Sequence, residues 1–178
     1  IPTYNAEDFI LPLITSCFKQ TLVPSQIIII DSSSTDSTYK LISSLENVTS
    51  IQINTEDFDH GKTRDYGISL SQFNFVCFLT QDVELGDVHY FENLLEPFKN
   101  DKIAAVTGRQ IAKPEHDLIQ KFTREFNYPQ KSMLKDSTCL STLGIKTYSI
   151  SDVCSAYRKE AYYKVGGFDY PIISNEDM

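Results

Sequence analysis

The sequence predicts an α/β fold with a mostly parallel central sheet flanked by helices. Two observations predict it. Residues 26–31, QIIIID, form a continuous apolar run of strand length that is rich in β-branched side chains, as in strands buried on both faces of a parallel sheet. Runs of this kind also alternate with helical patterns of about a dozen residues, which is the signature of βαβ units.

The other elements follow from their apolar patterns. Residues 7–19 carry apolar pairs at helical spacing and predict a helix, in which Pro12 either weakens the first turn or marks the true start. The opening IPTYN resembles the end of a first strand, and further strands are predicted at 26–31, 48–54, 75–80 and 103–108. Further helices are predicted within 32–46, within 56–72, around 118–126 and near 88–99, the last with Val88, Phe91, Leu94, Leu95 and Phe98 inward. Residues 151–169 are assigned to no element.

Length, composition and charge limit the possible functions. The chain has 178 residues and 41% hydrophobic residues, which suits one domain spanning residues 1–178. Its abrupt beginning and end favour a fragment truncated at both ends. The net charge of −8 argues against a general nucleic-acid-binding protein, which needs a basic face to displace counterions.

The cysteines and the apolar runs indicate the cellular compartment in which the chain is expected to lie. The four cysteines contain no C-x-x-C pair, and we expect four free thiols in a reducing compartment rather than disulfides. No apolar run approaches the roughly 20 residues of a transmembrane helix, and no signal peptide is visible. The sequence therefore predicts a cytoplasmic chain without a membrane span.

Carboxylates follow three successive predicted strands. Asp31 closes the first, Asp57 and Asp59 follow the second, and Asp82 closes the third. Ligands bind beyond the carboxyl ends of the strands in such sheets, so we expect these acids on one rim. A divalent metal, Mg²⁺ or Mn²⁺, is one reason to gather them. Turn formation or helix capping is the alternative for each aspartate taken alone.

Other polar residues can be interpreted either as ligand-binding or catalytic groups or as ordinary surface residues. Within FDHGKTRD (58–65), Lys62 and Arg64 could pair with phosphate, or the loop could be a solvated helix cap. His60 is more often a plain loop residue than a ligand, and Arg109 follows yet another predicted strand. Near the end, Glu176 and the adjacent Asp177 could include a general base or form a solvated pair.

Taken in order, these segments resemble one family. IPTYNA, IIIIDSSSTDST, GKTRDYGI, FLTQD, CSAYRKEAYYKVGGFD and NEDM look like a bacterial family 2 glycosyltransferase over essentially the whole chain. The resemblance implies the GT-A fold, which is Rossmann-like. FDHGKTRD, FLTQD, GRQ and CSAYRKEA are similar to the branch of rhamnosyltransferases, which use dTDP-L-rhamnose.

The resemblance also implies residue roles. Pro2, Thr3 and Tyr4 match the motif that lines the nucleotide pocket, Asp31 the acid that receives the base N–H, and Arg64 an arginine of the nucleotide site, with Lys62 as a second cation. Gln81 and Asp82 fall on a D-x-D-type motif, whose last acid binds the divalent metal. Asp177 matches the general base that deprotonates the acceptor hydroxyl.

Two residues depart from the family pattern. Gln81 replaces a common acid, so its contact with the ribose becomes a neutral hydrogen bond. Asp65 stands where asparagine is usual, where it either weakens the pocket or pairs with Arg64.

The function implied is metal-assisted, inverting transfer of a sugar, expected to be L-rhamnose, from a nucleoside-diphosphate donor to a glycan or lipid-linked acceptor. This reaction belongs to polysaccharide assembly, in the cytoplasm or at the inner face of the cell membrane with peripheral association. One alternative is a binding or structural domain of the same fold without turnover. A nucleotidyltransferase is disfavoured, because PTYNAEDF lacks a Gly- and Arg-rich phosphate loop.

Overall fold

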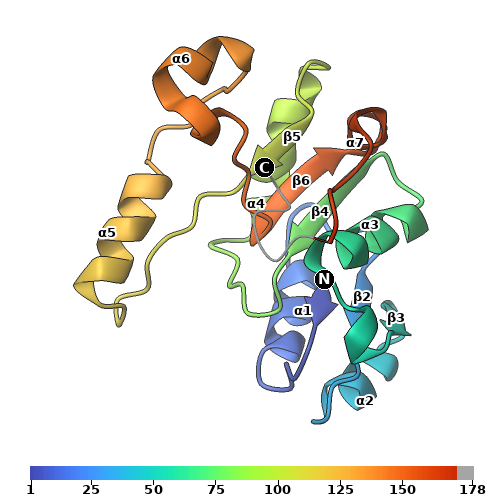
Figure 1. The fold of residues 1–178 in the computed structure, drawn as a ribbon. Coiled ribbons are helices and arrows are strands. Elements are labelled where there is room, and N and C mark those ends of the chain that lie inside the picture. Colours follow the sequence, from blue (N-terminus) through green and yellow to red (C-terminus); the bar gives the residue numbers. More distant parts are fainter. Residues whose placement is uncertain (172–178) are drawn as a thin grey trace.

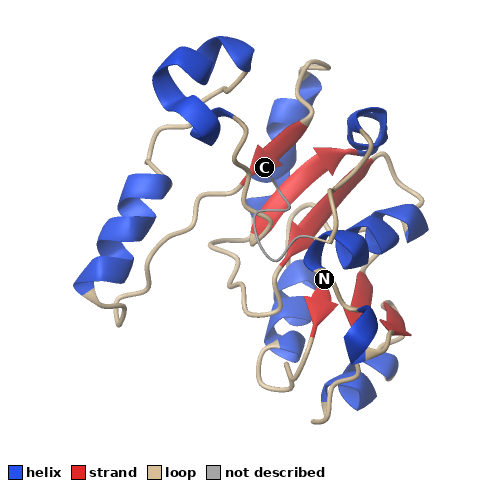
Figure 2. Cartoon of the chain, in the orientation of Figure 1, coloured by secondary structure: helices blue, strands red, loops and turns tan. Residues whose placement is uncertain are grey.

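A computed structural model describes residues 1–171, and its strands form two three-stranded sheets surrounded by helices (Figure 1; Figure 2). The first sheet is parallel, with the order β1 (Pro2–Thr3), β2 (Ile28–Asp31) and β3 (Thr49–Gln52). The second is antiparallel, with β6 (Cys154–Arg158) between β4 (Phe75–Leu79) and β5 (Ala105–Thr107). The α/β class is confirmed, but the sheet region is more mixed than the mostly parallel sheet that the sequence predicts.

The strand that makes the difference is β6, which the sequence analysis left unassigned. Its sequence, CSAYR, contains no β-branched residue and does not resemble a buried strand. Nevertheless its first four residues are buried, because β4 and β5 both pair with it. Long-range pairing therefore overrides local propensity at this strand.

The α-helices are α1 (Ile10–Phe18), α2 (Thr38–Ser43), α3 (His60–Leu70), α4 (Tyr90–Leu95), α5 (Leu118–Asn127), α6 (Leu140–Leu143) and α7 (Lys159–Val165). Helices α1 to α5 lie where the apolar patterns predict them, whereas α6 and α7 form in segments for which the sequence predicts no helix. Short 3₁₀ helices are η1 (Thr55–Asp57), η2 (Glu96–Lys99), η3 (Ser137–Cys139) and η4 (Gly144–Thr147). Pro12 lies in the first turn of α1, where its missing N–H breaks no helical hydrogen bond.

Two apolar clusters form the core. The larger includes Ile10, Ile29, Ile42 and Phe91, from α1, β2, α2 and α4. The smaller comprises Ile68, Phe78, Tyr157, Tyr162 and Phe168, and it joins α3 to β4, β6 and α7. The prediction of inward-facing residues near 88–99 is confirmed for Phe91, Leu94 and Phe98, which are buried. It is wrong for Val88, which precedes α4 and is 48% exposed.

The four cysteines are free thiols, as predicted. Cys17 and Cys154 are buried, and burial raises the pKa of these thiols to about 11 and about 12.

Among residues 1–171, no helix combines the length and the apolar character that crossing a bilayer requires.

Candidate nucleotide-sugar site at the ends of the strands

The ends of β1 and β2 meet at Asp31, whose side chain is fully buried. Its carboxylate accepts hydrogen bonds from the Thr3 hydroxyl (3.3 Å), the Ser34 backbone N–H (2.9 Å) and the Gln52 amide (3.3 Å). Pro2, one residue before Thr3, pairs with Ile30 of β2 in the parallel sheet. Asp31 therefore organises the turn after β2, and it also holds an acceptor at the carboxyl end of this strand.

The loops after β1 and β2 are joined by side-chain hydrogen bonds. The Asn5 side chain accepts from the Thr35 backbone N–H at 2.9 Å, and the Asn5 backbone N–H donates to the Ser34 hydroxyl at 2.9 Å. The Ala6 backbone N–H donates to the Thr38 hydroxyl at 2.7 Å. These contacts fix one rim of the site before any ligand binds.

Gln81 connects the two sheets. The Tyr4 backbone N–H donates to Gln81 Oε1 at 2.8 Å, and Gln81 Nε2 donates to the Tyr4 carbonyl oxygen at 3.1 Å. Tyr4 follows β1, and Gln81 lies just beyond β4. The amide is thus engaged with the backbone, while the Tyr4 side chain remains 46% exposed.

Asp82 follows Gln81 and is exposed. Its carboxylate accepts no hydrogen bond from any group within residues 1–171. The hydrogen bond from Lys113 to Glu84 raises the pKa of Lys113, and the charges of Glu84, Glu115 and Asp82 raise it further, Asp82 the least. Sequence reasoning did not anticipate this cation beside Asp82.

The expected rim of acids is not a metal-binding cluster. Asp59 caps α3 by accepting from the Lys62 backbone N–H at 2.9 Å, and Asp57 accepts from the Asn54 amide at 3.0 Å. In the described part of the chain, no group of three His, Cys, Asp or Glu side chains is arranged to hold a metal ion. Asp57 and Asp59 thus each stabilise a local turn or helix cap, which is the alternative that the sequence left open for each aspartate.

The Asp82 carboxylate nevertheless fits a divalent cation that is held jointly with a ligand. A hard oxygen ligand without a hydrogen-bond partner, exposed at a strand end, suits Mg²⁺ or Mn²⁺. These ions are commonly bound through one or two carboxylates together with substrate phosphates. The donor set is thus compatible with a metal that binds with a diphosphate rather than in a cage of protein groups.

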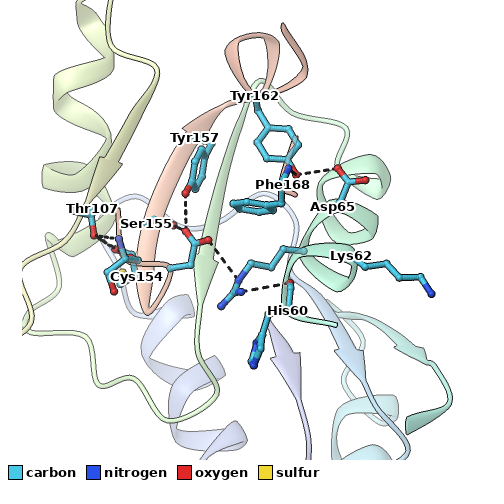
Figure 3. A network of polar contacts seen from close by, with 12 residues as sticks. His60, Lys62, Asp65, Thr107, Cys154, Ser155, Tyr157, Tyr162 and Phe168 are labelled. Carbon is cyan, nitrogen blue, oxygen red and sulfur yellow. Dashed lines mark hydrogen bonds and ion pairs between the residues drawn. The ribbon is translucent and has the colours of Figure 1, made fainter. Parts of the chain in front are cut away.

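A buried ion pair lies behind the strand ends. The side chain of Arg64, on α3, is only 6% exposed, and its Nε lies 3.7 Å from Oδ2 of Asp152. The Tyr157 hydroxyl donates to Asp152 Oδ1 at 2.9 Å, and the Ser155 hydroxyl donates to the same oxygen (Figure 3). Asp152 therefore fixes α3 against β6 through the arginine that the sequence assigns to the nucleotide site.

Asp65 contacts another part of the same layer. It accepts from the Tyr162 hydroxyl at 2.9 Å, and this hydroxyl accepts from the Phe168 backbone N–H at 3.1 Å (Figure 3). Burial raises the pKa of Tyr162, so the phenol remains a donor. The GGFD segment (166–169) forms a turn, with φ of 99° at Gly166 and 83° at Gly167.

The remaining predicted residues have surface positions. Lys62 lies 3.9 Å from Asp57 in an exposed pair, and His60 packs edge-on against Phe58. Arg109 donates from Nε to the Tyr128 carbonyl oxygen at 3.1 Å. Asp177, the predicted base, lies outside the described residues, as does Glu176.

Asp152, Ser155 and Tyr157 were not singled out by sequence reasoning. CSAYRK was recognised as part of a motif, but no role was assigned within it. One feature of the sequence could have identified these residues as functional. Two polar residues, Asp152 and Ser155, stand on either side of Val153 and Cys154 at the start of the CSAYR segment. Only the pairing of β6 shows that they are buried beside Arg64.

A domain whose first two parallel strands and β4 bring polar residues together at their carboxyl ends has the architecture of a nucleotide-binding transferase. The chain belongs to the family described as Glycosyl transferase family 2, whose model matches residues 1–166. This match confirms the family resemblance and the GT-A fold.

Curated relatives narrow the comparison. The chain is 37% identical over 179 residues to the O-antigen chain rhamnosyltransferase RfbN of Salmonella typhimurium, and 40% identical over 182 residues to the O-antigen chain rhamnosyltransferase WbaN of Salmonella anatum. Each alignment covers 100% of this chain and 57% of the relative. The chain thus spans somewhat more than half the length of these two relatives.

Solved structures show the same fold at low identity. Residues 1–349 of TarS from S. aureus superpose with a TM-score of 0.70 at 20% identity, covering 99% of this chain and 51% of that one. The mannosyltransferase PcManGT from Pyrobaculum calidifontis, solved in complex with GDP-Man and Mn²⁺, gives a TM-score of 0.68 at 16% identity, covering 99% and 48%.

Proposed function

We propose that this chain carries the donor-binding part of a glycosyltransferase that moves a sugar from a nucleoside diphosphate to a glycan or lipid-linked acceptor. We further propose that the donor is dTDP-L-rhamnose and that transfer inverts the anomeric centre. The identity to two rhamnosyltransferases supports the choice of sugar. The observation that carries the proposal is the joining of the β1, β2 and β4 ends into one polar rim with Asp82 exposed beside it.

The proposed roles of the rim residues follow from their contacts. Asp31 presents a carboxylate at the end of β2, and we assign to it the acceptance of an N–H from the base. Pro2, Thr3 and Tyr4 line the same end, and the exposed ring of Tyr4 offers a surface against which the base can lie. Gln81 keeps Tyr4 in place through its backbone, and we assign to Gln81 the contact with the ribose.

The diphosphate leaving group needs positive charge nearby to stabilise the negative charge that it gains. Negative charge develops on the diphosphate as the glycosidic bond breaks, and preorganised cations lower the barrier to this step. Lys62 is exposed and able to reach a ligand, whereas Arg64 acts from a buried position through its pair with Asp152. A divalent metal held by Asp82 and the donor phosphates would supply further positive charge at the leaving oxygens.

Acceptor activation is assigned to Asp177. A carboxylate on the face of the sugar opposite the diphosphate can take the proton of the acceptor hydroxyl as the new bond forms, which gives inversion. This assignment rests on the NEDM motif and lies outside the described residues.

The proposal is tested by calorimetry with dTDP and Mn²⁺ on the complete protein. We expect binding that weakens by on the order of tenfold or more in Asp82→Ala, the scale of losing one charge-stabilising contact. Asp101→Ala is the matched control, since Asp101 is 99% exposed and lies in the loop between η2 and β5. Unchanged binding in Asp82→Ala would refute the role of Asp82, and no binding by the wild type would refute the donor.

Turnover is measured separately, with dTDP-rhamnose and a lipid-linked acceptor, and Asp177→Asn is expected to bind donor normally but transfer at least about 10²-fold more slowly. Donor binding by the wild type without any transfer would instead support a binding domain of the same fold.

A further inference from the structure

Helix α5 presents its apolar side chains to the outside. Leu118, Ile119, Phe122 and Phe126 are 84%, 77%, 68% and 64% exposed, and none of the ten residues of α5 is buried. By contrast, Lys121 and Arg124 of the same helix are half-buried. A helix on a water-facing surface normally shows the opposite arrangement, with its apolar side toward the core.

This orientation is held by specific contacts. A capping box between Asp117 and Gln120 closes the first turn of α5. Beyond its last residue, the Tyr128 carbonyl accepts from Arg109 at 3.1 Å and the Tyr128 hydroxyl accepts from Gln110 at 2.7 Å, which ties the helix to the segment after β5. The rings of Phe122 and Phe126 stack with centroids 6.0 Å apart. The apolar stripe is therefore a formed surface rather than a frayed end.

The charge around α5 differs in sign from that of the rest of the chain. Between residues 109 and 149 the basic residues outnumber the acidic ones, giving a net charge of +3, whereas the whole chain carries −8 and the remainder therefore −11. The basic residues are Arg109, Lys113, Lys121, Arg124, Lys131, Lys135 and Lys146, and the acidic ones are Glu115, Asp117, Glu125 and Asp136. Lys146 lies directly against the stripe, with Nζ 4.3 Å from the Phe126 ring centroid.

We propose that the apolar stripe of α5, Leu118, Ile119, Phe122 and Phe126, is a docking surface for an anionic lipid membrane. Apolar side chains that insert at the headgroup boundary, with lysines beside them, are the features of an interfacial helix. Each lysine near an anionic surface adds to the attraction. Figure 1 shows α5 and α6 on one side of the molecule, away from the parallel sheet.

The charge pattern favours a membrane over a second copy of the chain. A symmetric dimer through this stripe would bring two segments of net charge +3 together, and like charges across an interface are unfavourable. An anionic bilayer satisfies both the stripe and Lys146, the cation that lies against it. The inference does not depend on which sugar is transferred.

The test is sedimentation of the complete protein with vesicles, without donor or acceptor. We expect binding to vesicles of mixed phosphatidylglycerol and phosphatidylcholine, weaker binding to phosphatidylcholine alone, and a decrease with added salt. Phe122→Ser should reduce binding on the order of tenfold, and Phe126→Ser similarly, as expected when one buried phenylalanine is lost. Lys146→Glu should weaken binding to the anionic vesicles in particular.

Matched controls come from α7. Val165→Ser removes a side chain that is 81% exposed, and Lys164→Glu reverses an exposed charge, so neither should change vesicle binding. Equal binding by the wild type and Phe122→Ser would overturn the proposal. Absence of vesicle binding by the wild type would also overturn it. If Phe122→Ser then has a lower Tm than the wild type, the stripe packs against another part of the protein. A dimer that Phe122→Ser dissociates would replace the membrane with a second copy.

Discussion

The side-chain amide of Gln81 forms two hydrogen bonds with the backbone of Tyr4, one in each direction, and thereby joins the end of β1 to the end of β4. An aspartate or glutamate could accept from the Tyr4 N–H but could not donate to its carbonyl oxygen. This relationship gives a physical reason for an amide rather than a carboxylate at position 81.

Gln81→Glu should therefore lower the free energy of unfolding. The substitution removes one hydrogen bond and places a carboxylate against the Tyr4 carbonyl, which we expect to cost about 1 kcal/mol at this partly exposed site. Urea denaturation measures it, with Gln130→Glu, at an exposed residue, as the control for added charge. Equal midpoints for the two variants would show that the Tyr4 contact contributes nothing.

Asp152→Ala should be strongly destabilising. Asp152 and Arg64 are buried together, and removal of the carboxylate takes a buried charge partner from the guanidinium, at a cost on the order of 3–5 kcal/mol. The measurement is the denaturation midpoint, and Asp101→Ala is the control at an exposed partner of Arg158. A small loss in Asp152→Ala would mean that the pair is replaced by water without consequence.

Alanine substitutions at the two glycines of the GGFD turn should distinguish the cost of backbone strain from the cost of steric crowding. Gly166→Ala should cost about 1–2 kcal/mol because φ is 99°, although nothing lies within 4 Å of the new Cβ. Gly167→Ala should cost more, since its Cβ would also meet Asp65 Oδ1 at 3.1 Å and the Tyr162 hydroxyl at 3.2 Å. Gly86→Ala has open space and no positive φ, and its Tm should stay within error of the wild type. Equal losses at Gly166 and Gly167 would exclude a contribution from crowding.

Stability should fall at alkaline pH because of the buried thiols. Burial raises the pKa of Cys154 from 9.0 to about 12, so in the folded state the thiol keeps its proton while in the unfolded chain it ionises. This stabilisation is fully present below about pH 9 and is lost as pH rises toward the folded pKa, by about 1.4 kcal/mol per pH unit for each thiol. Urea midpoints measured from about pH 8 to about pH 10 should fall less steeply in Cys154→Ala. A slope in Cys154→Ala as steep as that of the wild type would contradict the assignment.

Metal binding should depend on the nucleotide. Within residues 1–171, Asp82 belongs to no group of three side chains that could hold a metal ion, so Mn²⁺ alone should bind weakly. Adding dTDP should strengthen Mn²⁺ binding by completing the ligand set, a change that titration calorimetry reports. Tight Mn²⁺ binding without the nucleotide would point to a site other than Asp82.

Much of the fold follows from local patterns in the sequence. The strands β2, β3, β4 and β5 and the helices α1 to α5 lie within or near their predicted ranges, because apolar periodicity and β-branched runs are local signals. The GGFD turn and the free thiols were also predictable. The strand ends were correctly expected to gather polar residues, since the end of a strand is visible in the sequence.

What only the tertiary structure decided is which of these polar residues meet. Asp59 caps its own helix and Asp57 serves its own turn, whereas Asp31 meets Thr3 and Gln81 meets Tyr4 across large separations in sequence. Arg64 pairs with Asp152, 88 positions along the chain, which becomes its neighbour because β6 pairs with β4. The sequence by itself determines the elements and their polar ends, because these depend on neighbouring residues. Strand pairing and burial determine the partners, because they depend on residues that are distant along the chain.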